Sequence, residues 1–490
     1  MSKEIKLTES QNRVLDQLKD FVDSNRRVFI LKGYAGTGKT TLMRFFIRHL
    51  TEREVAFELL APTGRAAKVL SDAVLDDRFE QQQASLVGHT IHSQIFSYSG
   101  FNREVKEDEL LNANAQGQLS LVFEAVKPER DDNNRDIVYI VDEASMISDS
   151  IVNNPTQASF GTGRLLTELL EYDDSPRSKF VFVGDPCQLP PVGDLQSPAL
   201  REDSFEPKAL SASLTEIMRQ DNDNSLVNLS KQIRNMASSA PDSTEFYGDR
   251  KYWSKLPLRQ SSDVALHPSL NEMVHHYVNA VKQQGYEKNI FICHSNKSNK
   301  EICTQVRQLL GYSGSLPQQG ELLMVIQNNH PTGLVNGDTV RLECIRGPIR
   351  SQAGLNFIEA RVKDTVYDHS FNTLLLLDTL YTDQLNLPSW QQSNLFIDFF
   401  IRMKKQGIRQ ESAAFEDRMQ SDPYLNALRC VFGYSVTCHK AQGGEWDNVY
   451  LHLLRNIGLN PTKQTYRWLY TAITRAKQTL HIVNDSLYLT

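Results

Sequence analysis

The sequence predicts an α/β protein with two parallel-sheet domains in tandem, each interrupted by an inserted subdomain. Three observations predict this class. Short apolar runs alternate with helical stretches, polar residues follow each run, and the pattern occurs twice along the 490 residues. Buried parallel strands give continuous apolar runs, and ligands of such sheets bind beyond the carboxyl ends of the strands.

Four apolar runs predict the first sheet, and each ends in residues that can serve a ligand. They cover 28–31, 55–60, 137–141 and 180–183. A glycine-rich turn follows the first run, and 41–50 then has the pattern of a helix. The second sheet is predicted from runs at 289–293, 432–436, 449–453 and 479–483, with a helix from 296 to 310.

Two insertions interrupt these sheets. The stretch 93–136 is polar and acidic, and alternating residues near 119–126 predict a hairpin. Strand-like runs predict a small β-barrel over 340–380, and 388–428 is predicted to be helical. The helical stretch carries a basic patch, for which a solvated face is the favoured interpretation and nucleic-acid contact the alternative. The patch consists of Arg402, Lys404, Lys405 and Arg409.

The composition is that of a soluble globular protein, with 40% apolar and 23% charged residues. A net charge of −6 argues against a protein that is basic over its whole surface, although 429–490 carries a local +4. No apolar run is long enough to cross a bilayer, and the N-terminus lacks a secretory signal. The six scattered cysteines indicate neither a zinc site nor a disulfide framework, so we expect a reducing, cytoplasmic setting.

The glycine-rich turn at 33–40 reads GYAGTGKT, a G-x-x-x-x-G-K-T phosphate-binding loop between a strand and a helix. Its glycines let backbone N–H groups close around phosphate oxygens at the positive end of the helix. Lys39 can reach the β- and γ-phosphates, and Thr40 can ligate Mg²⁺. Asp142 and Glu143 follow the third strand; the first suits Mg²⁺ and the second can orient a water, which favours ATP hydrolysis.

The ordered motifs resemble superfamily 1 helicases, specifically the 5′→3′ superfamily 1B branch that contains RecD and the phage Dda helicase. The resemblance spans nearly the whole chain, and nine such segments in order are very specific. The segments are LTESQ (7–11), GYAGTGKTT (33–41), APTGRAAKVL (61–70), HTIHS (89–93), VDEASM (141–146), VGDPCQLPPVG (183–193), LTEIMRQ (214–220), YSVTCHKAQGGEWDNV (434–449) and LYTAITRAK (469–477).

The resemblance implies the nucleotide site. Gln11 would read adenine, Gln188 would sense the γ-phosphate, and Arg219 and Arg475 would be arginine fingers. The implied catalytic set is Lys39, Glu143, Gln188, Arg219 and Arg475, with Mg²⁺ on Thr40 and Asp142. The implied ATP-binding set is Gln11, Gly33, Ala35, Gly36, Thr37, Gly38, Lys39, Thr40, Thr41, Gln188, Arg219, Gly443, Glu445 and Arg475. Motif V departs from the family at Gly444, where relatives often have a hydroxyl residue.

The resemblance also implies the nucleic-acid contacts and the domains. The implied contacts are Pro62, Thr63, Arg65, Thr90, His92, Asn296, Asn299, Thr437, His439 and Lys440. The implied domains are RecA-like motor domain 1A (1–92 and 137–220), a pin-bearing insertion 1B (93–136), RecA-like motor domain 2A (221–339 and 429–490) and insertion 2B (340–428, SH3-like over 340–380 and helical over 388–428). Phe101 and Phe123 are candidates for the pin aromatic, with ordinary packing as the alternative.

We therefore expect an ATP-dependent DNA helicase that uses ATP and Mg²⁺ and moves 5′→3′ on single-stranded DNA; the polarity comes only from the resemblance. Its expected partners are single-stranded DNA and junctions of single- and double-stranded DNA, with no membrane. A monomer is expected because both arginine fingers are in one chain. The alternatives are an RNA helicase of the same superfamily and a P-loop ATPase switch that works without nucleic acid.

Overall fold

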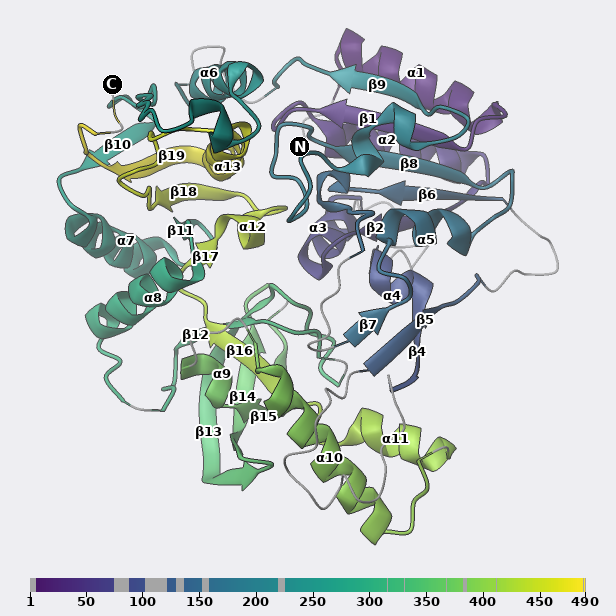
Figure 1. The fold of residues 1–490 in the computed structure, drawn as a ribbon, viewed down its shortest axis with the longest axis vertical. Coiled ribbons are helices and arrows are strands. Elements are labelled where there is room, and N and C mark those ends of the chain that lie inside the picture. The colour runs from purple at the N-terminus through teal and green to yellow at the C-terminus, as the bar shows by residue number, and fades with distance from the viewer. Residues whose placement is uncertain are drawn as a thin grey trace.

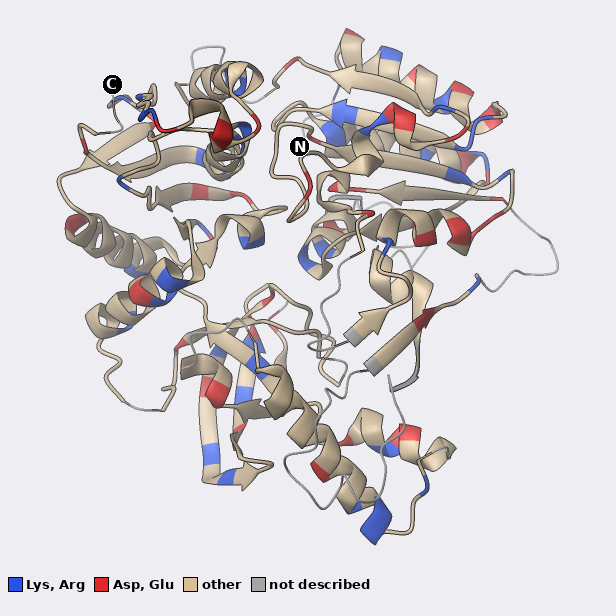
Figure 2. Ribbon diagram, in the orientation of Figure 1, with Lys and Arg blue, Asp and Glu red and all other residues tan. Residues whose placement is uncertain are grey.

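The structure is a computed structural model, and the residues it describes are 6–74, 88–101, 121–128, 136–151, 158–218, 225–314, 316–329, 331–366, 368–381, 386–410, 412–487 and 489. Two parallel sheets lie side by side, a closed barrel lies below the second sheet, and a helical segment extends beyond the barrel (Figure 1). Acidic and basic residues are scattered over all these parts (Figure 2). Among the described helices, none has both the length and the apolar character that crossing a bilayer requires.

The first sheet has six parallel strands in the order β3-β2-β6-β8-β1-β9. These are β1 (Val28–Gly33), β2 (Ala56–Ala61), β3 (His89–Thr90), β6 (Ile137–Val141), β8 (Lys179–Gly184) and β9 (Leu210–Leu214). The four predicted strands are confirmed. The two edge strands, β3 and β9, were not predicted because one has two residues and the other, LSASL, has alternating polar residues on an exposed edge.

Helices cover both faces of this sheet, as the alternation of side chains along each strand requires. Phe29 and Leu31 face α1 and α2, whereas Val28 and Ile30 face α4 and α5. The helices are α1 (Glu9–Asp23), α2 (Lys39–Glu52), α3 (Gly64–Val74), α4 (Ile91–Ile95) and α5 (Leu165–Tyr172), with short 3₁₀ turns η1 (Ala144–Met146), η2 (Pro198–Leu200) and η3 (Glu202–Ser204).

The predicted hairpin of the first insertion is present as β4 (Phe96–Phe101) and β5 (Leu121–Ala125), which pair antiparallel. A third strand, β7 (Ala158–Phe160), pairs parallel with β5 and comes from beyond the expected insertion boundary. Phe123 stacks on Phe160 with ring centroids 4.7 Å apart, so its ring is used in packing. The side chain of Phe101, the other pin candidate, lies outside the described residues.

The second sheet has five parallel strands in the order β10-β19-β18-β11-β17. Its strands are β10 (Val264–His267), β11 (Asn289–Cys293), β17 (Val436–Thr437), β18 (Trp446–Leu451) and β19 (Ala476–Val483). Its helices are α6 (Ser225–Ser239), α7 (Leu270–Gln284), α8 (Asn296–Leu310), α12 (Cys438–Ala441) and α13 (Lys463–Ile473), with the 3₁₀ turn η4 (Thr244–Tyr247). The edge strand β10 was not predicted.

The prediction of one strand over 432–436 is wrong, because this apolar run serves two sheets. Strand β16 (Leu428–Phe432) belongs to the barrel, and the chain then passes through 433–435 into β17. A Cβ on Gly433 would lie 3.2 Å from backbone atoms of Leu323 and Met324. Backbone therefore packs on backbone where the chain changes sheets, and only glycine fits without displacement.

The barrel is larger than the predicted stretch 340–380. Its five strands are β12 (Leu322–Val325), β13 (Thr339–Gln352), β14 (Leu355–Asp364), β15 (Ser370–Leu376) and β16. Strand β12, and β16 from its second residue onward, lie in segments that the sequence analysis assigned to motor domain 2A. Short apolar strands read alike in a parallel sheet and in a closed barrel, so the pattern alone could not separate them.

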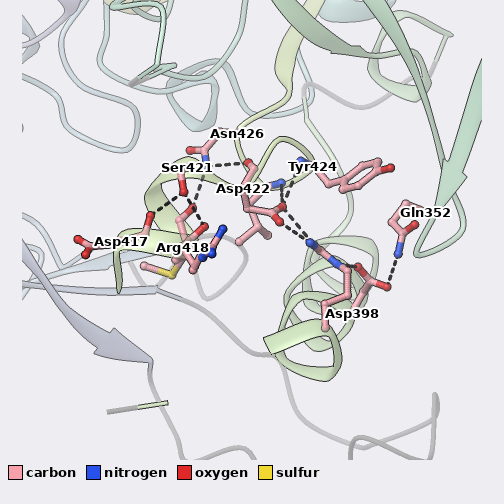
Figure 3. Close-up of polar contacts among 11 residues, drawn as sticks. Gln352, Asp398, Asp417, Arg418, Ser421, Asp422, Tyr424 and Asn426 are labelled. Carbon is pink, nitrogen blue, oxygen red and sulfur yellow. Dashed lines mark hydrogen bonds and ion pairs between the residues drawn. The ribbon is translucent and has the colours of Figure 1, made fainter. Parts of the chain in front are cut away.

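The helical prediction for 388–428 is confirmed by α10 (Ser389–Lys405) and α11 (Ala413–Ser421), with the short α9 (Asp378–Tyr381) before them. Phenylalanines of α10 pack on Phe415 of α11. Arg402, from the predicted basic patch, donates to Asp398 and to Asp422, which follows α11 (Figure 3). This arginine joins the two helices, and the other members of the patch, Lys404, Lys405 and Arg409, are exposed.

A buried ion pair joins the second sheet domain to the barrel, and it generates a prediction about stability. Arg307 of α8 donates from Nε to Glu321, just before β12, at 2.5 Å, and Glu321 is 0% exposed. We expect Arg307→Met to lower the free energy of unfolding by about 3–5 kcal/mol, because it leaves a buried carboxylate unpaired. Urea denaturation measures this change.

The control is the half-exposed pair of Arg361 and Glu343 within the barrel. Arg361→Met is expected to cost under about 1 kcal/mol, since exposed pairs contribute little. Equal losses in the two variants would contradict the assignment of Arg307 to the junction.

Candidate nucleotide and nucleic-acid sites

The phosphate-loop candidate at 33–40 joins the end of β1 to the start of α2. Gly36 and Gly38 have φ angles of 78° and 77°, the left-handed region that favours glycine. The Lys39 ammonium donates to the carbonyl oxygens of Gly33 at 2.8 Å and Tyr34 at 3.1 Å. The cation therefore lies inside the loop at the helix N-terminus, where phosphate oxygens are favoured. The hydroxyl residues of the first turn, Thr40 and Thr41, are half-buried beside it.

The Gln11 side chain, expected to read adenine, is buried and bonded at both ends. Its oxygen accepts from the Thr8 N–H at 3.0 Å, which completes a capping box at the start of α1. Its amide nitrogen donates to the Thr37 carbonyl oxygen at 3.1 Å. The N-terminal segment is thus attached to the phosphate loop through one glutamine.

The acidic pair Asp142 and Glu143 follows β6, and both residues are half-buried. The Asp142 carboxylate accepts from the Glu143 N–H at 2.8 Å, and Glu143 has a left-handed φ of 49°. Burial, and then the neighbouring Asp142, raise the pKa of Glu143 to about 7; Arg475 and Lys39 oppose this rise. Burial likewise raises the pKa of Asp142. The structure therefore brings the two acids, Lys39 and Arg475 into one electrostatic neighbourhood, although they come from both sheets.

A contact that the sequence analysis missed joins the loop to the second sheet. The Tyr470 hydroxyl, on α13, donates to the Asp185 carboxylate at 2.7 Å. The Ala35 N–H of the loop donates to the same oxygen at 2.9 Å and to the Tyr470 oxygen at 3.1 Å. In addition, the Arg234 guanidinium of α6 lies 3.6 Å from the ring centroid of Tyr34. Two elements of the second domain therefore touch the phosphate loop.

The segment after β8 is also bonded across the domains. Gln188 is buried, and its side-chain oxygen has no hydrogen-bond partner among the described residues. The next residue, Leu189, donates its N–H to the Thr471 hydroxyl at 2.9 Å and accepts from the Gln442 amide at 3.2 Å. A movement of this segment would therefore change its hydrogen bonds to α13 and to the turn after α12.

Of the two expected arginine fingers, Arg475 is buried within its own domain. Arg475 is 3% exposed and donates to the Thr471 and Gly444 carbonyl oxygens and to the Thr474 hydroxyl, all in its own domain. Arg219 lies outside the described residues. Arg475 is therefore held in place before any ligand arrives, at the boundary of α13 and β19.

The turn 443–446 lies against α3 of the first domain. A Cβ on Gly443, which has a φ of 76°, would lie 3.5 Å from Ala66. Arg65, expected at the nucleic acid, lies over the Trp446 ring at 4.7 Å, so it contacts the second domain. Glu445, expected at the nucleotide, is exposed.

The other candidates for nucleic-acid contact follow strand ends, as expected, and several cap helices. The Thr63 and Thr90 hydroxyls accept from N–H groups at the starts of α3 and α4, and Pro62 is half-buried beside the first. Ser295, in place of Asn296, caps α8. The Asn299 side chain accepts from the Ser435 hydroxyl at 2.6 Å, which occupies it within the second domain.

The histidine and lysine candidates differ in their surroundings. His92 packs against the Phe160 ring at a centroid distance of 5.0 Å, so the aromatic cluster of the insertion holds it. Thr437 precedes α12 without capping it, His439 is exposed, and burial lowers the pKa of Lys440. These three candidates for nucleic-acid contact lie in and just after β17, the edge strand of the second sheet.

Two family models match the chain. One, described as an AAA domain, matches residues 6–252, and the other, described as a UvrD-like helicase C-terminal domain, matches residues 432–483. The first covers half of the chain and contains the phosphate loop and both acids. The second contains Tyr470 and Arg475.

The chain is similar to curated proteins over different lengths. It is 22% identical to the RecBCD enzyme subunit RecD of Buchnera aphidicola subsp. Schizaphis graminum, over 94% of this chain and 70% of that protein. It is 29% identical to the ATP-dependent DNA helicase Pif1 of Psychrobacter sp. (strain PRwf-1), over 36% of this chain and 21% of that protein. Among solved structures, a Bacteroides Pif1 helicase in complex with ADP-AlF3 and ssDNA aligns with a TM-score of 0.47 and 14% identity, over 99% of this chain and 95% of that one.

The packing of Gln11 on the loop generates a prediction for nucleotide affinity. A Cβ on Gly38 would lie 2.4 Å from the Gln11 amide nitrogen. We expect Gly38→Ala to displace Gln11 and to weaken binding of a fluorescent ATP analogue by at least about tenfold, which corresponds to about 1.4 kcal/mol. The control is Gly311→Ala: this residue has a φ of 89° but open space around its Cβ position. Unchanged affinity in Gly38→Ala would contradict the role of the Gln11 contact.

Proposed function

This chain belongs to the AAA domain family over residues 6–252 and is a superfamily 1B helicase of the RecD and Pif1 type, and from that premise we propose that it hydrolyses ATP to move 5′→3′ along single-stranded DNA and to unwind duplex. The observation that carries the proposal is the bonding of the phosphate loop to the second domain through Asp185 and Tyr470. A ligand that changes the loop must change this contact, so nucleotide state and domain arrangement are coupled.

We assign roles in hydrolysis as follows. Lys39 would bind the β- and γ-phosphates, and Thr40 and Asp142 would hold Mg²⁺ through hard oxygen ligands. Glu143 orients the attacking water. Mg²⁺ would neutralise charge on the phosphates, while the residues of the chain position the nucleotide and the water.

In this proposal, side chains from both domains contact the γ-phosphate. The unpartnered amide oxygen of buried Gln188 supports a sensor role, because a buried polar atom without a partner is costly unless a ligand or water completes it. Arg475, with Arg219, supplies permanent positive charge to the transition state, an effect worth about 10³–10⁵ in rate. Because Arg475 comes from the second domain, hydrolysis requires the domains to close.

The proposed DNA path runs over the strand ends of both sheets, from Thr63 and Thr90 to Thr437, His439 and Lys440. Hydroxyl and cationic groups hold phosphates without reading bases, which suits a translocating protein. The partners we propose are single-stranded DNA and its junctions with duplex. One chain supplies both arginines, so we propose a monomer, working in the cytoplasm.

The raised pKa of Glu143 generates a prediction for the pH dependence of ATPase activity. The carboxylate is the form that can accept a hydrogen bond from water, so protonation below a pKa of about 7 removes activity. We expect kcat/KM for Mg·ATP to rise with pH through about 7, and Glu143→Gln to abolish turnover while retaining ATP binding. A kcat/KM that does not change across this range would contradict the assignment.

The polarity of movement is tested by single-turnover unwinding of duplexes with a 5′ or a 3′ single-stranded tail. We expect unwinding of the 5′-tailed substrate alone, and none by Lys39→Ala, which should still bind single strands. Preference for the 3′ tail would overturn the polarity. Stimulation of ATPase by poly(U) above poly(dT) would favour an RNA helicase, and ATPase that ignores every nucleic acid would favour a switch.

A further inference from the structure

Three histidines meet on one face of the second sheet, at the side remote from the first domain. They are His267 at the end of β10, His276 on α7 and His481 on β19. Helix α7 and β10 lie at the outer edge of the molecule, whereas α12 and α13 lie toward the first domain (Figure 1). The cluster is therefore separate from the nucleotide site, and no proposed step of hydrolysis uses it.

The register of the sheet explains how residues far apart in sequence converge here. Ala265 of β10 is paired with His481 of β19, and His267 lies two residues further on, so both histidines point to the same face. Tyr450 of β18 is paired with His481 on its other side. Helix α7 packs on this face and adds His276.

The distances suit coordination of a single ion. One ring nitrogen from each histidine lies within 4.8 Å of the other two. His267 Nε2 and His481 Nδ1 are already 2.9 Å apart. A tetrahedral zinc ion with Zn–N distances of about 2.0–2.1 Å requires nitrogens about 3.3 Å apart, so small side-chain rotations suffice.

The ring environment suits imidazole ligands. The Tyr450 ring stacks on His481 at 4.1 Å, and its hydroxyl lies 2.9 Å from His276 Nδ1, so one residue fixes two of the three rings. Oriented rings of this kind are typical of histidine metal sites. Burial lowers the pKa of all three histidines, which favours the neutral imidazole that a metal ligand requires.

The donor set selects the class of ion. Three imidazole nitrogens suit Zn²⁺ and related transition metals, whereas Mg²⁺ prefers oxygen ligands. His481 is buried and His276 is exposed, so the site opens on its α7 side. We propose that His267, His276 and His481 bind a divalent transition metal, with Zn²⁺ the expected ion, and that water completes a tetrahedral shell. The bound ion would fasten α7 to strands β10 and β19.

The test compares two neighbouring histidines on α7 in the full-length chain. His275 and His276 are both exposed, but only His276 belongs to the cluster. The chelator-stripped protein is titrated with Co²⁺, followed by visible absorption, and then with Zn²⁺, followed by calorimetry. In wild type and in His275→Gln we expect absorption bands of tetrahedral Co²⁺, which added Zn²⁺ removes. In His276→Gln we expect the affinity for the metal to fall by at least about tenfold, a change of about 1.4 kcal/mol.

A second measurement separates metal loss from misfolding. Zn²⁺ is expected to raise the melting temperature of wild type and His275→Gln but not of His276→Gln, whose melting temperature without metal should match wild type. Glutamine can still bond to the Tyr450 hydroxyl, and His267→Gln provides an independent second variant. Equal affinity in the variants of His275 and His276, or no Zn²⁺-dependent stabilisation of wild type, would overturn the proposal.

Discussion

One carboxylate, Asp185, joins the glycine-rich loop of the first domain to the second domain. It accepts the Ala35 N–H of the phosphate loop and the Tyr470 hydroxyl of the second domain on the same oxygen. A phosphate that enters the loop competes for the same backbone donors, because a loop of this kind binds anions through its N–H groups. In the proposed nucleotide site, a bound phosphate and the second domain would therefore share a small set of polar groups.

Other contacts also join the two domains around the loop. Leu189 is bonded to Thr471 and Gln442, and Arg234 lies over Tyr34, so the domains touch at several points around the loop. Arg475, by contrast, is held entirely by its own domain. In the closing motion that we propose, Arg475 would approach the nucleotide already positioned. Preorganised charge of this kind is the most effective in stabilising a transition state.

Local patterns in the sequence were sufficient to predict the central strands of both parallel sheets, a barrel in the second insertion, and the glycine-rich turn at 33–40 between a strand and a helix. Each of these signals lies in residues that are neighbours in the chain. The roles of that turn and of Asp142 and Glu143 in nucleotide binding stay predictions. The short or polar edge strands were not predicted. The division of 432–436 between two sheets was not predicted either, because it depends on the packing of Gly433 on β12. The contact of Tyr470 with Asp185 joins residues 285 positions apart. Such a contact depends on how the domains meet, and the bond of Ser435 to Asn299 depends on how α8 meets the segment before β17. Residue patterns along the chain do not contain that information.

The passage of the chain through Gly433 has a mechanical consequence. Only residues 433–435 separate barrel strand β16 from sheet strand β17, and the glycine backbone lies directly on β12. Together with the ion pair of Arg307 and Glu321, this close packing holds the barrel tightly against the second sheet domain. If the second sheet domain rotates, we expect the barrel to turn with it as one body. The helices α10 and α11, which lie beyond the barrel (Figure 1), would then move the farthest.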